Sequence, residues 1–338
     1  MNLDWENLGF NVIPTDYNVR SVFRDGKWGD LEVFSEDTIS MHIGATCLHY
    51  GQESFEGLKA YTGADDRVRL FRHIDNARRM SISAKGILLA EVPESLFAEA
   101  VEKVVMLNKK FVPPYGTGAS LYIRPLLIGT GPEVGVRPAK EYTFLVFVMP
   151  VGPYFKEGFK PLDVMICRDH DRAAPLGTGH LKVGGNYAAS MSSIAEAHAN
   201  GFATAMYLDA KEKKYIDECG PANFFGIKNN TYVTPKSHSI LASITNRSLQ
   251  ALAEDMGMKV EVRPVPVEEL SEFEEVGACG TAAVITPFRK VVDFEKEITY
   301  SFGNGIHPGP VTSKLYHTLT SIQKGDIEDR HGWVKILD

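Results

Sequence analysis

The alternation of hydrophobic and polar residues predicts both strands and helices in the first third of the chain. Residues 58–61 and 68–71 are short runs of β-type residues separated by a polar, glycine-containing stretch, which predicts a hairpin. Asp75 is expected to cap the helix that follows. Apolar residues then recur at helical spacing over residues 93–110, so a second helix is expected there.

The hydrophobic period changes to two at residues 120–125. In a strand, Tyr122 and Arg124 project from one face and apolar side chains from the other, so a phenol and a guanidinium point the same way. Residues 142–149 form an almost continuously apolar strand that ends at a Pro-Val-Gly-Pro stretch. Because two prolines around a glycine make a stiff extended connector, we place the domain boundary at residues 150–158.

The second half of the chain intersperses strands and helices without an internal repeat. A helix is expected over residues 187–199, ended by Asn200 and Gly201 as a left-handed cap, and another opens at residues 242–247. This arrangement is typical of a mixed α and β enzyme rather than a bundle or a sandwich. The remaining expected elements are strands at 163–167, 203–208, 224–227 and 260–262, and a last helix at 311–323.

Composition narrows the class of protein. The 338 residues suggest two domains of unequal size. A net charge of -7 argues against nucleic acid or an anionic membrane as the main partner. The four cysteines have no CxxC spacing, so we expect reduced thiols rather than a disulfide framework. The acidic first residues and the lack of a long apolar run predict a soluble, cytoplasmic protein.

One lysine is the candidate for covalent chemistry. Lys182 precedes a glycine pair, an amide and a phenol in the stretch from His180 to Tyr187. A lysine amine becomes a nucleophile where a buried site lowers its pKa, and it then forms Schiff bases with carbonyl compounds or with pyridoxal phosphate. Taken alone, these eight residues favour a surface lysine in a glycine turn, so only the rest of the chain can support the catalytic interpretation.

Two segments could bind a phosphate through backbone amides. Ile244 and Thr245 follow Ser243 at a predicted helix start, where first-turn amides lack intrahelical partners. Gly280 and Thr281 lie in a small-residue turn that permits close approach of the backbone to an anion. An ordinary helix cap and a plain turn between strands remain open as alternatives.

Charged side chains could complete such a site. Arg79, on the first predicted helix, would add positive charge against a phosphate, although a solvated helix arginine gives the same pattern. Glu218 precedes a small-residue bend and an apolar strand, and a carboxylate held in a cleft can keep a pyridine nitrogen protonated. A surface acidic turn is the alternative for Glu218.

A metal site is disfavoured by the spacing of the candidate ligands. Asp169, His170, Asp171 and His180 lie close in sequence, but the first three form a polar loop without the i, i+4 spacing of a helical ligand pair. We therefore expect a solvated loop and no metal. The sequence fingerprints of dinucleotide-binding, P-loop and serine-hydrolase sites are also missing.

Taken together, the motifs resemble those of the class IV pyridoxal-phosphate aminotransferases, and within them the branched-chain amino acid aminotransferases. Each motif is weak alone, but their order along nearly the whole chain makes a specific signal. They are Tyr-Gly-Gln-Glu-Ser-Phe-Glu-Gly-Leu-Lys-Ala at 50–60, Leu-Tyr-Ile-Arg-Pro at 121–125, Val-Gly-Pro-Tyr at 151–154, Lys-Val-Gly-Gly-Asn-Tyr at 182–187, Glu-x-x-x-x-Asn-Phe-Phe at 218–225 and Gly-Thr-Ala at 280–282.

The resemblance implies a two-domain fold type IV architecture, similar to D-amino acid aminotransferase, in the α+β or mixed α and β class. A smaller N-terminal domain would span residues 1–149, and a larger cofactor-binding domain would span residues 159–338. The resemblance further implies pyridoxal 5′-phosphate as cofactor, amino acids and 2-oxo acids as partners, and a homodimer with its sites near the subunit interface.

The same resemblance implies which residues bind the cofactor. Lys182 would hold pyridoxal phosphate as an internal aldimine and shuttle the proton between substrate Cα and cofactor C4′, which gives ping-pong kinetics. Glu218 would pair with the pyridinium nitrogen, and Tyr187 with the ring oxygen. The phosphate would be held by Arg79, Ile244, Thr245, Gly280 and Thr281.

The substrate pocket implied by the resemblance accepts both an aliphatic side chain and a carboxylate. Tyr122 and Arg124 would bind the distal carboxylate of glutamate or 2-oxoglutarate, and the backbone of Thr281 and Ala282 would bind the α-carboxylate. The expected reaction is transamination of L-leucine, L-isoleucine and L-valine with 2-oxoglutarate, giving branched 2-oxo acids and L-glutamate. The aromatic walls of the pocket would be Tyr50, Phe55, Tyr154 and Tyr187.

Two departures from related sequences affect these expectations. Mammalian relatives carry a CxxC pair where this chain has Ala283 and Thr286, so thiol redox control of that kind is not expected. Gly220-Pro221 stands where some relatives have a threonine. Cys219 and Cys279 flank the candidate site and are expected to be packed small residues rather than nucleophiles.

Three alternative functions stay open. A D-amino acid aminotransferase or an aminodeoxychorismate lyase would share Lys182 and Glu218 with the proposed enzyme. A non-catalytic protein that binds a phosphorylated metabolite would use Lys182 as a plain charge.

Overall fold

The computed structural model describes residues 3–5, 7–152 and 158–338. The chain forms two compact units that interleave along the sequence. Unit 1 comprises Met1–Lys156, Leu181–Gly184 and Ser321–Asp338, and unit 2 comprises Glu157–His180 and Gly185–Thr320. The predicted connector 150–158 lies largely outside the described residues, although the strand before it continues to Val151. The predicted division assigned all of 159–338 to one domain, whereas Leu181–Gly184 and Ser321–Asp338 belong to the same compact unit as the N-terminal residues.

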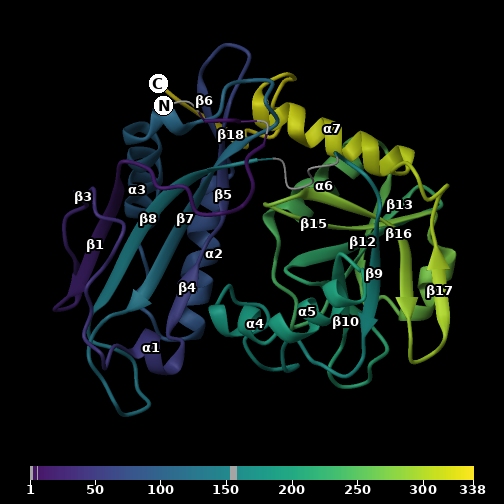
Figure 1. Ribbon diagram of the computed structural model, residues 1–338, viewed down its shortest axis with the longest axis horizontal. Coiled ribbons are helices and arrows are strands. Elements are labelled where there is room, and N and C mark those ends of the chain that lie inside the picture. The colour runs from purple at the N-terminus through teal and green to yellow at the C-terminus, as the bar shows by residue number, and fades with distance from the viewer. Residues whose placement is uncertain (1–2, 6, 153–157) are drawn as a thin grey trace. The chain divides into compact units, whose positions relative to one another are not determined.

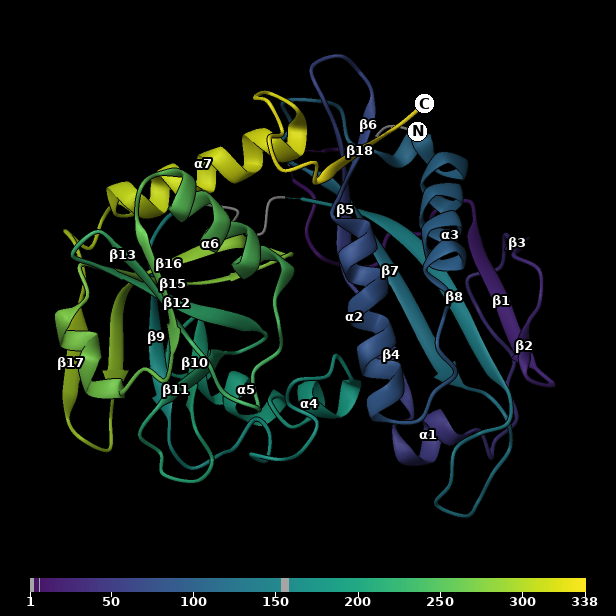
Figure 2. The same ribbon diagram turned by 180° about the vertical axis from the view of Figure 1, so that it is seen from behind.

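Unit 1 is built on one sheet with strand order β18-β6-β5-β7-β8-β1-β2, to which β3 and β4 are added beside β1 and β7. Figure 2 shows α2 and α3 lying across one face of this sheet. The strands are β1 (Asn18–Arg24), β2 (Lys27–Trp28), β3 (Glu32–Phe34), β4 (Glu53–Phe55), β5 (Leu58–Thr62), β6 (Val68–Phe71), β7 (Ser120–Gly129), β8 (Tyr142–Val151) and β18 (Val334–Leu337). The helices are α1 (Thr46–Tyr50), α2 (His73–Gly86), α3 (Glu94–Leu107) and the 3-10 turn η1 (Lys109–Phe111).

The core of unit 1 lies between those helices and the sheet. Phe97 and Val104 from α3 pack with Leu121 and Ile123 from β7, and all four are fully buried. Alternation along β7 sends these apolar side chains to the helix-covered face, so Tyr122 and Arg124 project from the opposite face, as the sequence predicts. The polar face of β7 is therefore available for a site.

Unit 2 contains a closed barrel. Its sheet runs β11-β10-β9-β16-β15-β12-β13-β14, and an additional β11–β12 pairing closes the first part of this path into a ring (Figure 1). The strands are β9 (Leu162–Cys167), β10 (Thr204–Leu208), β11 (Ile216–Cys219), β12 (Ala222–Lys228), β13 (Thr231–Pro235), β14 (Lys259–Arg263), β15 (Glu275–Gly280), β16 (Val284–Asp293) and β17 (Ile298–Ser301). The helices are α4 (Gly184–Ala188), α5 (Met191–Ala199), α6 (Ile244–Asp255), η2 (Val267–Glu272) and α7 (Pro310–Lys324).

Apolar side chains fill the barrel. Val164, Met206, Phe224 and Val276 come from four of its strands and belong to one buried cluster. Closure matters because it pairs the backbone groups that an open sheet leaves at its edges. The β11–β12 hairpin that completes the ring turns at Gly220, whose φ of 54° is in the left-handed region.

Most predicted elements are present, and three expectations need correction. Asp75 does not cap α2, because the helix begins at His73 and the Asp75 carboxylate instead pairs with Arg72 at 2.7 Å. The helix expected over 187–199 is two helices, α4 and α5. It breaks where the Ser190 hydroxyl bonds the Asn186 carbonyl, a local bond that competes with the helical pattern. The α-helix and strands without a counterpart among the predicted elements are α1 and β1, β2, β3, β4, β11, β13, β15, β16, β17 and β18.

Among the described residues, every helix is too short or too polar to cross a membrane.

Candidate functional site

Lys182 lies in unit 1, on a short segment held by hydrogen bonds through its backbone. Its amide donates to Ser83 Oγ of α2 at 2.9 Å, and its carbonyl accepts from Ser54 Oγ at 3.0 Å and from Phe55 N at 3.2 Å. Burial, reinforced by the positive charge of Arg79, lowers the pKa of Lys182 to about 8. A lysine with this pKa has a substantial neutral fraction in weak base, which nucleophilic chemistry requires.

The surroundings of the Lys182 amine are aromatic and cationic. Its Nζ lies 4.6 Å from the centre of the Phe55 ring, and the Arg124 guanidinium carbon lies 4.9 Å from the centre of the same ring. Arg124 Nη2 also donates to the Tyr122 hydroxyl at 3.2 Å. Within the described residues, Arg124 Nε is buried and has no hydrogen-bond partner. A buried donor of this kind suits a carboxylate ligand, because only an acceptor would offset its desolvation.

Arg79, on α2, is buried and held by Glu56. Its Nε and Nη2 donate to the two Glu56 oxygens at 2.8 and 2.7 Å, and Asn76 Nδ2 adds a bond to Glu56 at 2.7 Å. Glu56 is fully buried, in the turn between β4 and β5. This two-point pairing fixes the plane of the guanidinium, which an arginine needs to receive an anion in one geometry.

Glu218 lies in unit 2, on β11, and is buried among donors. Its Oε1 accepts from Asn223 Nδ2 at 2.7 Å and from the Leu241 amide at 2.9 Å. Its Oε2 lies 3.0 Å from Nε of Arg172, which is itself buried. A guanidinium and two N–H donors favour the ionised form of the carboxyl group.

The two predicted phosphate-binding segments also lie in unit 2. Ser243 caps α6 by accepting a bond from Asn246 N, so the sequence prediction of a helix start is confirmed. The preceding first-turn amides belong to Ile244 and Thr245, both buried. Asn246 connects this turn to the Glu218 region through bonds from its Nδ2 to Thr234 Oγ1 at 2.9 Å and to Asn223 Oδ1 at 3.4 Å.

The second predicted phosphate-binding segment is the turn after β15. Gly280 ends that strand, and Thr281 and Ala282 are half-buried. A Cβ added at Gly280 would meet only Ala222, at 3.8 Å, so the glycine leaves open space above the backbone. The donors in both segments are backbone amides and small side chains, which is the chemistry that suits a phosphate ester.

The remaining predicted site residues have different surroundings. Tyr50 ends α1, is 40% exposed, and donates its hydroxyl to the Val134 carbonyl in the loop between β7 and β8. Tyr187 lies on α4 in unit 2 and is half-buried. Tyr154 lies outside the described residues. Unit 1 therefore brings Phe55, Tyr122, Arg124 and Lys182 together, and unit 2 links Glu218 to the first turn of α6.

Three residues that hold the predicted site had no role assigned from the sequence. Arg172 follows a polar loop, and only its burial beside Glu218 distinguishes it from a solvated arginine. Asn223 and Glu56 are parts of motifs, but neither carried a predicted contact. Glu56 lies between Phe55 and Gly57 in a stretch that also carries Glu53 and Lys59, so no signal in the sequence distinguished it.

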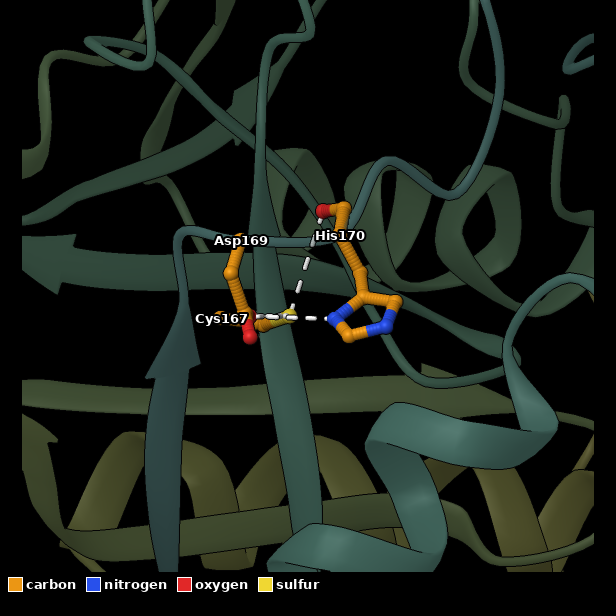
Figure 3. A group of neighbouring side chains, drawn as sticks. All are labelled: Cys167, Asp169 and His170. Carbon is orange, nitrogen blue, oxygen red and sulfur yellow. Dashed lines mark hydrogen bonds and ion pairs between the residues drawn. The ribbon is translucent and has the colours of Figure 1, made fainter.

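The loop considered as a metal site contains one compact group among the described residues. Figure 3 shows the side chains of Cys167, Asp169 and His170 beside one another. Their candidate ligand atoms all lie within 4.8 Å of one another. Internal contacts account for this geometry: the thiol donates to Asp169 Oδ1 at 3.5 Å, and His170 Nδ1 lies 3.1 Å from the same oxygen. Burial raises the pKa of Cys167 to about 11, and the side chains of Asp169 and His170 are 68% and 41% exposed.

Cys219 and Cys279 are buried free thiols. Burial raises the pKa of both, and the nearby Glu218 charge raises it further. Thiols with a raised pKa are poor nucleophiles, which agrees with packed small residues.

Comparison with known proteins places this geometry in a family. The family described as amino-transferase class IV matches residues 53–291. The branched-chain-amino-acid aminotransferase of Haemophilus influenzae is 48% identical over 98% of this chain and 98% of its own length. The corresponding protein of Helicobacter pylori is 45% identical over 98% of this chain and 97% of its own.

The chain belongs to the class IV aminotransferases. A solved structure agrees: the crystal structure of the Escherichia coli branched-chain amino acid aminotransferase superposes with a TM-score of 0.81 at 29% identity, over 96% of this chain and 100% of that one.

Class IV membership confirms several predictions made from the sequence. The protein is an aminotransferase, its fold is the mixed α and β fold of this class, and pyridoxal phosphate is the cofactor of the class.

Proposed function

We propose that this class IV aminotransferase transfers the amino group between L-leucine, L-isoleucine or L-valine and 2-oxoglutarate. The names of the relatives support this substrate class. The observation that carries the proposal is the arrangement around Lys182, where an amine with a lowered pKa lies beside an aromatic wall and an orphaned guanidinium donor. Apolar and anionic groups of the two substrates can both be accommodated there.

Bound pyridoxal phosphate supplies an electron sink that accepts the electron pair left behind when the substrate α-proton departs. Lys182 would hold the cofactor, and its amine would remove and return that proton as general base and acid. Its lowered pKa suits both roles, since a base works best when its pKa lies near the working pH.

Glu218 pairs with the pyridine nitrogen of the cofactor in this proposal. Arg172, Asn223 and the Leu241 amide keep the carboxylate ionised and oriented, so that it can hold a proton on the ring nitrogen. Tyr187 bonds the ring oxygen. The phosphate is held by Arg79, by the first-turn amides of Ile244 and Thr245, and by Gly280 and Thr281.

Candidate residues for substrate selection occur in each unit. Phe55 provides an apolar wall, with Tyr50, Tyr154 and Tyr187 as further aromatic walls. Tyr122 and Arg124 take the distal carboxylate of glutamate and 2-oxoglutarate, and the backbone at Thr281 and Ala282 takes the α-carboxylate. We also propose that the protein is a homodimer and is cytoplasmic, as expected for this family.

Borohydride reduction of the holoenzyme tests the choice of lysine. Peptide mass spectrometry should find the reduced cofactor on Lys182 and none on Lys59, a buried lysine of unit 1 whose pKa burial also lowers to about 8. Lys59 is a matched internal control because the two amines have similar intrinsic reactivity. A label on Lys59, or no label on a colourless protein, contradicts the proposal, and the second result favours a phosphometabolite-binding protein.

A donor panel tests the substrate class. With 2-oxoglutarate as acceptor, L-leucine, L-isoleucine and L-valine should each give glutamate. D-alanine should not, and aminodeoxychorismate should yield no pyruvate. Preference for D-alanine, or pyruvate release from aminodeoxychorismate, would replace the proposal with one of the other class IV activities.

A further inference from the structure

The segment that carries Lys182 has a fourth anchor besides the three bonds to the Lys182 backbone. Gly184 N donates to Glu53 Oε1 at 2.5 Å. Glu53 is the first residue of β4, and Ser54 and Phe55 of the same strand hold the Lys182 carbonyl. Three consecutive residues of β4 therefore form hydrogen bonds to the lysine segment, on both sides of Val183.

The Glu53 contact differs from the others because it uses a partly buried carboxylate. Burial raises the pKa of Glu53, while the Gly184 amide and the positive charge of Arg124 act in the opposite direction. A carboxylate accepts a stronger hydrogen bond from a backbone amide than a neutral oxygen does. The bond is therefore suited to fixing the position of a flexible glycine-containing segment.

The glycine at position 184 matches this contact sterically. A Cβ built there would overlap Glu53 Oε1 and would lie 3.0 Å from Cδ and 3.8 Å from Oε2, and these are its three nearest atoms. Such an overlap requires displacement. Glycine at this position lets the carboxylate approach the backbone directly, so Glu53 and Gly184 form one structural pair.

We propose that Glu53 is a positioning residue for Lys182, acting through its hydrogen bond to Gly184 N. This inference rests on the proposed function, in which Lys182 moves a proton. General acid–base transfer requires donor and acceptor within hydrogen-bond reach, and a shift of about 1 Å can cost on the order of a hundredfold in rate. Glu53 acts on the chemical step rather than on substrate affinity.

Substitutions at Glu53 separate a positioning role from a purely structural one. In the holoenzyme, Glu53→Ala should lower kcat by about tenfold or more while KM for L-leucine changes by less than about threefold. Glu53→Gln keeps an acceptor oxygen at the same reach and should recover most of the lost kcat. Glu141→Ala is the matched control, because it removes a carboxylate of unit 1 paired with the exposed Arg24 and should leave kcat unchanged.

A double-mutant cycle between positions 53 and 184 gives a second test. Gly184→Ala should reduce kcat strongly beside Glu53, and much less when combined with Glu53→Ala, because the clash then disappears. Near-normal kcat in Glu53→Ala, equal losses in Glu53→Gln and Glu53→Ala, or strictly additive effects of the two substitutions would overturn the inference. Wild-type protein without a borohydride label on Lys182 would instead overturn the proposed function.

Discussion

Lys182 in unit 1 and Glu218 in unit 2 are both ionisable, yet the protein holds them in opposite ways. Lys182 is anchored through its own peptide groups, and its surroundings disfavour the charged amine. Glu218 is anchored through its carboxylate by two N–H donors and a guanidinium. A group that has to gain and lose a proton is fixed through its backbone, which leaves both protonation states of the amine accessible. A group that has to stay charged is fixed by bonds that require the charge.

Of the substitutions that test this comparison, removal of the Lys182 amine should change the rate of transamination most. Lys182→Ala should lower the rate of transamination by about 10³-fold or more, because both cofactor attachment and proton transfer are lost. The assay is glutamate formation from L-leucine and 2-oxoglutarate. Lys85→Ala, on the exposed side of α2, is the control and should behave like wild type. Near-normal activity in Lys182→Ala would mean that another lysine does the chemistry.

Glu218→Gln should have the second largest effect on kcat. It should also lower stability, because it leaves a buried guanidinium without its ion-pair partner. We expect kcat to fall by about a hundredfold, as for loss of one preorganised electrostatic partner. Stability should fall by about 3–5 kcal/mol, because Arg172 is left buried without its counter-charge. Thermal unfolding and kcat measure the two effects.

The double variant Glu218→Gln/Arg172→Met separates these two effects. It should recover much of the lost stability, since neither Glu218 nor Arg172 is left as a buried charge without the other, but none of the lost kcat. Recovery of activity along with stability would show that Glu218 serves the fold alone.

Glu56→Gln should have a smaller effect, confined to cofactor retention. The buried two-point pairing with Arg79 is lost, so the guanidinium is less well oriented, and the dissociation constant for pyridoxal phosphate should rise about tenfold. Glu94→Gln is a matched control, because it breaks the exposed pair with the neighbouring Arg78. Equal affinities in wild type and Glu56→Gln, measured by equilibrium dialysis, would contradict a role for the pairing.

The smallest expected effect is a pH dependence of stability in the cofactor-free protein. Folding lowers the pKa of Lys182 from 10.5 to about 8, so the unfolded chain binds more protons between those values. Lys182 therefore disfavours folding below pH 8, and this penalty is relieved as the pH rises toward 10.5. Lys182→Met should remove that rise. The free energy of urea unfolding is measured for the wild type and for Lys182→Met at about pH 8 and about pH 10. Lys59 contributes equally to the pH dependence of both proteins, so its contribution cancels in the difference between them. Parallel pH dependence in both would show that Lys182 is not desolvated.

The sequence predicted elements and site residues best where local pattern determines the outcome. The alternation in β7 placed Tyr122 and Arg124 on one face, and Ser243 marked the start of α6, because neighbours a few residues apart decide both features. Asp75 was predicted as a cap because an acidic residue near a helix start is typical of caps. Arg72, three residues earlier, takes its carboxylate instead.

The supports of the site were not predictable because their partners are remote in sequence. Arg172 meets Glu218, and Glu53 meets Gly184, only after strands from different parts of the chain have assembled. The strand β18 was missed for the same reason, since its pattern is short and its partner β6 lies far earlier in the chain. A single sequence shows which residues are unusual for their surroundings. It does not show which distant group makes them stable.

The interleaving of the two units limits how this protein can be divided or rearranged. The segment Leu181–Gly184 belongs with unit 1, although the chain on both sides of it belongs to unit 2. A gene cut after residue 156 would leave the first fragment with β4 but without Lys182. The second fragment would carry the lysine but none of its anchors. Recombination between relatives at this junction would therefore combine the Lys182 segment of one parent with β4 of the other. Only parents whose β4 and Lys182 segments are compatible should give active chimeras.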